Sequence, residues 1–216
     1  MAMRRRCSRL LPLLWIAGAC APSAGGPTLD PELSTEADAA AWEFQNPGSW
    51  RVGDGVLQLH TPGRPGGPIR KPAEWAILRG DHFGSVTVEA QVRADAPVTR
   101  MGRDVLIYFG YQSPTRFYYA HLSNETSTPH NGIFLVNDAD RRRIDDGTAV
   151  PRLLDDQWHD VRLERDVRSG TIRVFLDDMA TPVLQATDTT LRTGRIGFGS
   201  FDDPAAFRSI RVRALE

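Results

Sequence analysis

The sequence is poor in the residues and motifs that most often carry covalent or metal chemistry. It has two cysteines, Cys7 and Cys20, and a single lysine, Lys71, so all its other basic residues are arginines. It has no His-Glu-x-x-His zinc helix, no Gly-x-Ser-x-Gly elbow and no glycine-rich phosphate loop. It also lacks a run of about 20 apolar residues, the length that a membrane-spanning helix needs. These absences exclude the enzyme classes that those motifs define.

The N-terminal segment has the features of an export signal. Four arginines precede a short apolar run from Leu10 to Ala19, and small residues follow it. The end of the run, "AGAC", resembles the lipobox of bacterial lipoproteins, in which the cysteine is lipidated and becomes the first residue. We therefore expect a lipid on Cys20 and a place in the bacterial envelope, at the outer membrane or cell surface. Ordinary signal cleavage nearby is the alternative.

This cleavage would fix the organisation and the charge of the mature chain. We expect a signal peptide over residues 1–19, a flexible tether over 20–40 and one folded domain over 41–216. Cys7 leaves with the signal, so Cys20 has no disulfide partner. Four arginines leave as well, which leaves 22 basic residues (26 less four) against 27 acidic ones, a net charge of about −5. A nucleic-acid partner is therefore not expected.

The rest of the chain has the pattern of short β-strands. In "QWHDVRLERDVRSGTIRVFLDD" apolar and polar residues alternate on both sides of a turn at Ser169 and Gly170, which predicts a hairpin. About twelve such segments follow one another, separated by Gly, Pro, Asp and Ser, and "TEADAAAWEF" predicts one short helical turn. The fold class expected is all-β, a two-sheet antiparallel jelly-roll sandwich.

Four segments carry a resemblance to a known superfamily. They are "WRVGDGVLQL", "FGSVTVEAQVR", the hairpin quoted above and "GRIGFGSFDD", and the likeness covers most of residues 42–216. In this order they resemble the concanavalin A-like lectin/glucanase superfamily, above all laminin G-like and 3-keto-disaccharide hydrolase-type domains. The resemblance implies a jelly roll whose concave face often meets glycans. It does not settle the activity, because such folds serve lectins, hydrolases, lyases and spacers alike.

Motifs for catalysis or metal binding are weak. The Glu-x-Asp-x-Glu strand of laminarinase-type glucanases is missing, which excludes a retaining glucanase of that type. "HNGIF" partly resembles an Asn-Ser-Gly-Ile segment of the 3-keto-disaccharide hydrolase relatives, although Asn131-Gly132 also predicts a plain turn. The histidines lack zinc-site spacing. No cofactor or metal is expected, except that Asp202 and Asp203 are oxygen donors for a structural calcium or else form a turn.

The arginine cluster from Arg141 to Arg143 raises the question of an anion site. It lies beside four acidic residues, Asp138, Asp140, Asp145 and Asp146. Opposite charges so close in sequence predict a solvated loop that neutralises itself, and we expect no anion site there.

The best candidate binding surface lies in the hairpin "RDVLIYFGYQSPTRFYYAHLSNE". A turn at residues 113–115 would pair Tyr111 with Phe117 and direct Phe109, Tyr111, Phe117 and Tyr119 to the core. The other face would then carry two tyrosines that flank small residues, an arrangement suited to stacking on a sugar ring. The alternative is that the tyrosines pack under a loop. The residues expected to contact glycan are Tyr108 and Tyr118, with His121, Asn124, Asn131 and Asp138 at the edge.

These observations predict a lipid-anchored jelly-roll protein that binds or processes a glycan, with binding favoured. The first alternative is a glycoside-cleaving enzyme of the 3-keto-disaccharide hydrolase type. The second is a module that recognises a partner other than a glycan. The sequence predicts membrane contact through the lipid anchor only.

Overall fold

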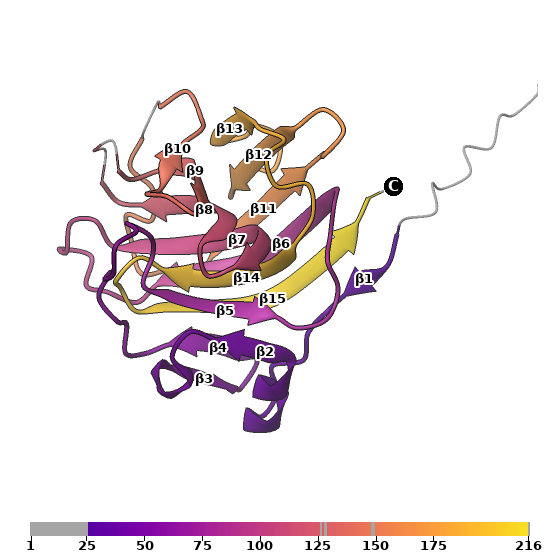
Figure 1. Cartoon of the computed structure of the whole chain (residues 1–216). Coiled ribbons are helices and arrows are strands. Elements are labelled where there is room, and N and C mark those ends of the chain that lie inside the picture. The colour runs from indigo at the N-terminus through magenta and orange to yellow at the C-terminus, as the bar shows by residue number, and fades with distance from the viewer. Residues whose placement is uncertain (1–25, 126, 128, 148–149, 216) are drawn as a thin grey trace, which may run out of the picture.

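The computed structural model describes residues 26–125, 127, 129–147 and 150–215. Its secondary structure is almost entirely β (Figure 1). The described helices are two short 3₁₀ turns, η1 (Glu36–Ala41) and η2 (Pro47–Ser49). Among the described residues, no helix has the length and apolar character needed to cross a membrane. The all-β prediction is confirmed, and η1 falls in the segment that predicted a helical turn.

The strands form two antiparallel sheets. The eight-stranded sheet has the order β13-β12-β11-β6-β15-β4-β3, and β1 pairs with β15 beside that path. The seven-stranded sheet has the order β10-β9-β8-β7-β14-β5-β2. The strands of the first sheet are β1 (Thr28–Leu29), β3 (Trp50–Gly53), β4 (Val56–Leu59), β6 (Val86–Ala94), β11 (His159–Arg165), β12 (Thr171–Leu176), β13 (Leu184–Thr187) and β15 (Ala205–Ala214). Those of the second are β2 (Trp42–Phe44), β5 (Glu74–Leu78), β7 (Asp104–Ser113), β8 (Arg116–Ser123), β9 (Gly132–Asn137), β10 (Arg142–Arg143) and β14 (Arg195–Ser200).

The main core lies between the two sheets, as the period-two pattern predicts. Along β6 every second residue from Val86 to Ala94 is buried, while the residues between them are only partly covered. The hairpin β11–β12 has the predicted alternation, with Val161 and Leu163 in the core beside Val174. Because strand side chains alternate between faces, this hairpin needs only one apolar face to pack on the opposite sheet.

The packed domain includes part of the segment expected to be a flexible tether. Strand β1 pairs with β15 through Thr28 and Leu29, and Leu33 is buried in the core at 5% exposure. The carbonyls of Leu33 and Ser34 also accept hydrogen bonds from the turn at Asp54 and Gly55. The expected boundary at residue 41 is therefore wrong. One apolar side chain and a two-residue strand in a polar, proline-containing stretch were enough to fix it to the sheet.

The face assignment of the β7–β8 hairpin is confirmed for β7 as far as Phe109 and is wrong for Tyr111 and for β8. Phe109 pairs with Tyr118, whereas Ser113 pairs with Arg116, so β7 has two more residues than β8 between the two pairs. Gly110 lies in this irregularity with a φ of +59°. Phe109 lies in the main core and Tyr111 on the opposite face, so this irregularity exchanges the faces of β7 on its far side. The turn has two residues, 114 and 115, instead of the predicted three, which places Tyr118 opposite Phe109. Tyr118 therefore points into the main core and stacks on Phe109, with ring centroids 5.1 Å apart.

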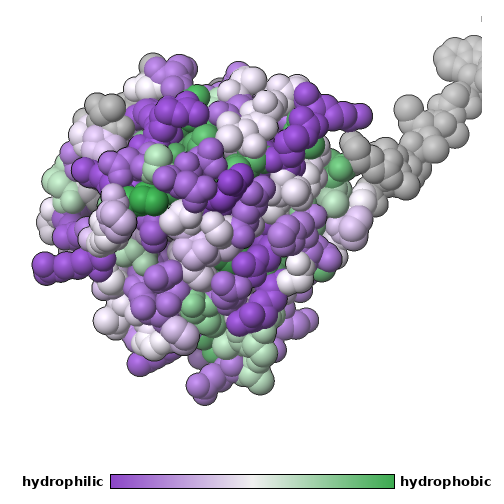
Figure 2. All heavy atoms as spheres, viewed as in Figure 1, coloured by the Kyte–Doolittle hydropathy of each residue, from purple (hydrophilic) through white to green (hydrophobic). Residues whose placement is uncertain are grey.

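The outer face of the seven-stranded sheet carries a second buried cluster. It consists of Trp75, Ile77, Leu106, Tyr108, Tyr111, Phe117, Tyr119, Phe134 and Val136. The Gly- and Pro-rich segment 61–73, here called the strap, contributes Ile69 to this cluster. Gly63 N donates to Glu74 Oε1 at 2.9 Å, and Arg70 N donates to Asp140 Oδ1 at 2.7 Å. Figure 2 shows a mainly hydrophilic surface on one side of the molecule, with small separate apolar patches.

Candidate functional site

A groove opens where the strap meets the loop after β14. Its volume is about 660 Å³, and it is lined by Pro62, Gly63, Arg64, Pro65, Ala96, Pro97, Arg100, Asp202, Asp203 and Pro204. Pro204 precedes β15, and Asp202 and Asp203 follow β14, so the groove lies at one end of the sandwich. Its charged groups come from three separate segments. Polar, concave and partly open, it has the form expected of a small-ligand site.

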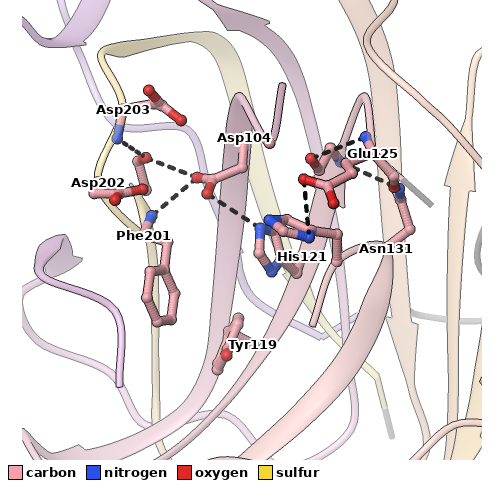
Figure 3. A network of polar contacts seen from close by, with 12 residues as sticks. Asp104, Tyr119, His121, Glu125, Asn131, Phe201, Asp202 and Asp203 are labelled. Carbon is pink, nitrogen blue, oxygen red and sulfur yellow. Dashed lines mark hydrogen bonds and ion pairs between the residues drawn. The ribbon is translucent and has the colours of Figure 1, made fainter. Parts of the chain in front are cut away.

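Asp104 links the strands behind this groove. It is the first residue of β7 and is 1% exposed. Its Oδ1 accepts hydrogen bonds from Ser200 Oγ at 2.7 Å and from Phe201 N at 2.9 Å. Ser200 Oγ in turn accepts from Asp203 N at 2.8 Å. The carboxylate therefore fixes the start of the 201–204 loop, and with it the two aspartates of the groove (Figure 3).

Two histidines continue this polar network away from the groove. The Nε2 of His121, a residue 1% exposed, lies 3.1 Å from Asp104 Oδ2, an ion-pair distance without hydrogen-bond geometry. Its ring is 5.2 Å from that of His130, whose Nδ1 lies 2.7 Å from Ser127 Oγ. Burial and the neighbouring His121 lower the pKa of His130. His130 is therefore a neutral imidazole near pH 7, with a side chain 20% exposed.

Asp203 is the most perturbed carboxyl group of the groove. Its side chain is 2% exposed, Oδ1 is bound by Arg100 Nε, and Oδ2 has no hydrogen-bond partner in the described structure. Burial, and then the nearby Asp104, raise the pKa of Asp203 to about 6. A carboxyl with that pKa holds a proton part of the time near neutral pH. It has the properties of a general acid.

Asp104, Asp202 and Asp203 also form the one carboxylate set in the described residues with metal-ligand spacing, their oxygens lying within 4.8 Å of one another. Arg100 already supplies positive charge there, because it binds Asp203 and lies 3.8 Å from Asp202. The oxygens of Asp104 are likewise engaged by Ser200, Phe201 and His121. The arrangement is satisfied by protein groups, with the exception of Asp203 Oδ2.

The structure separates the two tyrosines expected to stack on sugar. Tyr108 lies in the outer cluster and donates from its hydroxyl to Glu74 O at 3.0 Å, whereas Tyr118 lies in the main core. Both are 0% exposed. The pair therefore forms no common platform, and the strap shields the outer face on which Tyr108 lies. Packing under a loop, the alternative considered for these tyrosines, holds for Tyr108.

The other predicted contacts divide between two ends of the sheet. His121, Asn124 and Asn131 lie near the network, and Asn124 holds the neighbouring loop by accepting from Gly102 N and donating to Arg100 O, both at 2.9 Å. Asn131 is fully buried, with a φ of +47°, and it accepts from Ser123 N at 2.9 Å. Asp138 follows the opposite end of β9 and accepts from Thr115 Oγ1 at 2.6 Å. It does not reach the site.

Asp104 and Arg100 were not predicted from the sequence as site residues, and His130 was considered only as one of the histidines without zinc-site spacing. The sequence indicated Asp202 and Asp203 only as calcium donors. One signal was available: Asp104 opens an otherwise apolar strand in "RDVLIYF", and an ionisable residue at such a position needs a buried partner. Nothing local linked it to residues 200–203.

Comparisons with solved structures show the fold. A carbohydrate-binding module of the CBM66 type from Bacillus subtilis is 16% identical with a TM-score of 0.59, over 79% of this chain and 94% of that one. Winged bean acidic lectin, complexed with methyl-α-D-galactose, is 10% identical with a TM-score of 0.58, over 88% of this chain and 99% of that one. Bacillus licheniformis β-glucanase is 12% identical with a TM-score of 0.54, over 90% of this chain and 100% of that one. The concanavalin A-like jelly roll is thereby confirmed.

A search of curated proteins gives no match. Residues 32–213, which include the groove and the polar network, match a family described as the 3-keto-alpha-glucoside-1,2-lyase-like domain. The match extends over most of the chain and agrees with the resemblance found in the sequence. The chain belongs to the family of 3-keto-alpha-glucoside-1,2-lyase-like domains.

Proposed function

We propose that the protein cleaves a glycoside in the groove by general acid–base catalysis, with Asp203 as the acid. The observation that carries the proposal is the Asp203 carboxyl, which lines the groove with one oxygen unpartnered and a pKa of about 6. Lectin-like stacking loses support because Tyr108 and Tyr118 are buried on opposite faces. Membership of a lyase-like family supports a carbohydrate substrate.

The family description suggests an elimination across carbons 1 and 2 of a 3-keto sugar. A ketone at carbon 3 acidifies the hydrogen on carbon 2, so a base removes that proton and its electron pair forms a carbon–carbon double bond. The bond from carbon 1 to the glycosidic oxygen then breaks, and the acid protonates the departing oxygen. We assign the acid to Asp203, the carboxyl of the groove lining whose pKa is raised. Asp104 positions it by fixing Ser200 and Phe201 at the start of its loop.

Sugar binding without cleavage is the second candidate. Arg100 and Asp202 are 47% and 41% exposed at the groove, where they offer charged donors and acceptors to sugar hydroxyl groups. Such groups bind a sugar whether or not a reaction follows. The two candidates differ in whether a product forms.

The test uses an α-glucoside oxidised at carbon 3 and the same glucoside unoxidised. Elimination gives an unsaturated ketone that absorbs ultraviolet light, and hydrolysis gives two saturated sugars. We expect the oxidised substrate to yield the absorbing product. Asp203→Asn should lower its rate at least about 100-fold, the usual contribution of a general acid. Asp81→Asn, at an exposed position outside the groove lining, is the matched control and should leave the rate unchanged.

The outcomes separate the candidates. Sugar binding by calorimetry without product from either substrate favours the binding role. Product formation that Asp203→Asn leaves at the parent rate would contradict the assignment of the acid.

We also propose that the protein is a lipoprotein of the bacterial envelope, attached through Cys20. Cys20 and the expected signal peptide lie outside the described residues. The support is the lipobox-like "AGAC" in the sequence.

A further inference from the structure

Arg141 differs from its two neighbours in the arginine cluster. Arg143 binds Asp145, as expected of a self-neutralising loop, whereas Arg142 lies 3.5 Å from Asp188, an acid outside the loop. Arg141 makes no ion pair within the described part of the chain. Its guanidinium lies over the rings of Phe201 and Phe134, at 4.3 and 4.9 Å from their centroids, and donates to Tyr119 Oη at 2.9 Å. The side chain is held in place without its charge being neutralised.

Arg70 of the strap is fixed beside Arg141. Its backbone carbonyl accepts from Arg141 N at 2.9 Å, and its backbone N donates to Asp140 Oδ1 at 2.7 Å. Its side chain is exposed and has no carboxylate partner among the described residues. Both guanidiniums act on one group, because both Arg141 and Arg70 favour the ionised form of the buried Tyr119 hydroxyl. Arg141 therefore lies on Phe201, and Arg70 is joined to it through the backbone, while neither side chain forms an ion pair in the described part of the chain.

The surroundings bring this pair close to the groove. The Arg141 guanidinium lies over the ring of Phe201, and Phe201 directly precedes the groove residues Asp202 and Asp203. The strap that contains Arg70 also provides Arg64 to the groove. The nearby acids are engaged elsewhere: Asp104 with Ser200 and His121, Asp203 with Arg100, and Asp140 with the Arg70 backbone. In the described part of the chain neither the Arg70 nor the Arg141 guanidinium lies within ion-pair distance of a carboxylate.

We propose that Arg70 and Arg141 form an oxyanion subsite, and that the sugar bound in the adjoining groove carries a carboxylate, as a uronic acid residue does. This inference rests on the proposed sugar-binding groove and adds the class of its substrate. A guanidinium presents its N–H groups in a flat fork that matches a carboxylate. Stacking on Phe201 and Phe134 fixes the plane of that fork before the ligand arrives, which lowers the entropic cost of binding.

The experiment compares methyl α-D-glucuronide with methyl α-D-glucoside, which differ in a carboxylate in place of a hydroxymethyl group. We expect calorimetry to give at least tenfold tighter binding of the glucuronide, with the difference shrinking at high salt. Arg141→Met and Arg70→Met keep an apolar stem and remove the charge, and each should reduce the preference. Arg51→Met, at an exposed position on the distant strand β3, should preserve it. Sodium acetate is a third ligand, which offers the carboxylate without the sugar.

Equal affinities for the two glycosides, or no binding of either, would overturn the inference. So would a folded Arg141→Met or Arg70→Met protein with the full preference. Acetate binding as tight as glucuronide would reduce the subsite to a plain anion site and also contradict it. If Arg141→Met fails to fold by circular dichroism, Arg70→Met and the salt dependence decide. Because binding is measured without cleavage, the inference and the proposed enzyme activity fail separately.

Discussion

The Asp203 carboxyl shows how one residue acquires an unusual acidity. It follows a strand end that Asp104 fixes, so two carboxyl groups are held close together away from water. Both effects oppose ionisation, and Arg100 compensates them only in part. The ordinary pKa of an aspartate, 3.8, is thereby raised to about 6. Such a shift costs stability at neutral pH, and a cost of this kind at a groove is typical of a functional site.

The pH dependence of unfolding tests this shift. Between pH 4 and 6 the unfolded chain releases the Asp203 proton while the folded protein keeps it, so this group makes the folded state less stable as the pH rises. Asp203→Asn does not titrate. The free energy of unfolding of this variant, relative to that of the parent, should therefore increase between pH 4 and 7, by up to about 3 kcal/mol for a shift of this size. Urea unfolding at several pH values measures it, and a constant difference between the two proteins would contradict the raised pKa.

At the scale of elements, the bulge at Gly110 decides what each face of the β7–β8 hairpin presents. A Cβ at this position would lie 2.7 Å from Arg165 Nη1 and 3.1 Å from Tyr118 Cδ2. The positive φ of 59° is also a conformation that side chains disfavour. Glycine therefore allows β7 to gain residues relative to β8 and Tyr111 to leave the core side on which Phe109 lies. Tyr119, on the outer face, supports Arg141.

We expect Gly110→Ala to destabilise the fold. The left-handed backbone alone should cost roughly 1–2 kcal/mol, and the contact with Arg165 adds to it. Thermal unfolding followed by circular dichroism measures the loss. Gly48→Ala is the matched control, because a Cβ there meets nothing within 4 Å and its φ is not in the left-handed region, so its stability should stay near that of the parent. Equal melting temperatures for the two variants would show that the bulge does not require glycine.

At the scale of the whole molecule, the core, the outer cluster and the groove lie on different surfaces of the two sheets. The faces between the sheets form the core, and the strap covers much of the outer face of the seven-stranded sheet, so the groove remains at the end of that sheet. The chain near Thr28 is fixed to β15, and Figure 1 shows β1 on the opposite side of the molecule from β10. A domain held by its N-terminal side would leave the β10 end, with Arg141 just before it, directed outward.

Attachment through Cys20 is tested in the intact cell. Cys20→Ala removes the thiol that would carry the lipid, so the protein should move from the membrane fraction to the soluble fraction of the envelope. Cys7→Ser alters the other cysteine, within the expected signal, and should leave the protein in the membrane fraction. Immunoblots of separated fractions and mass spectrometry of the N-terminal peptide give the readout. Full membrane retention of the Cys20→Ala protein would contradict the proposed anchor.

The sequence by itself determined the fold class, because period-two alternation needs only neighbouring residues to be visible. Val161, Leu163 and Val174 lie where that pattern places them, in an antiparallel sandwich of the predicted superfamily. The sequence also marked His121, Asn124 and Asn131, which lie near the polar network. Local pattern was sufficient wherever a residue's role depended on its own strand.

Only the tertiary structure decided the site. Asp104 and Phe201 are 97 positions apart in the chain, and the pairing of β7 with β14 alone brings them together. The faces of Tyr118 and Tyr119 depended on a turn one residue shorter than predicted, and the face of Tyr111 on the irregularity at Gly110, which alternation cannot reveal because it interrupts the alternation itself. Arg141 differs from Arg142 and Arg143 for a similar reason: in space Asp138 and Asp145 pair with other arginines, and Asp140 binds the Arg70 backbone.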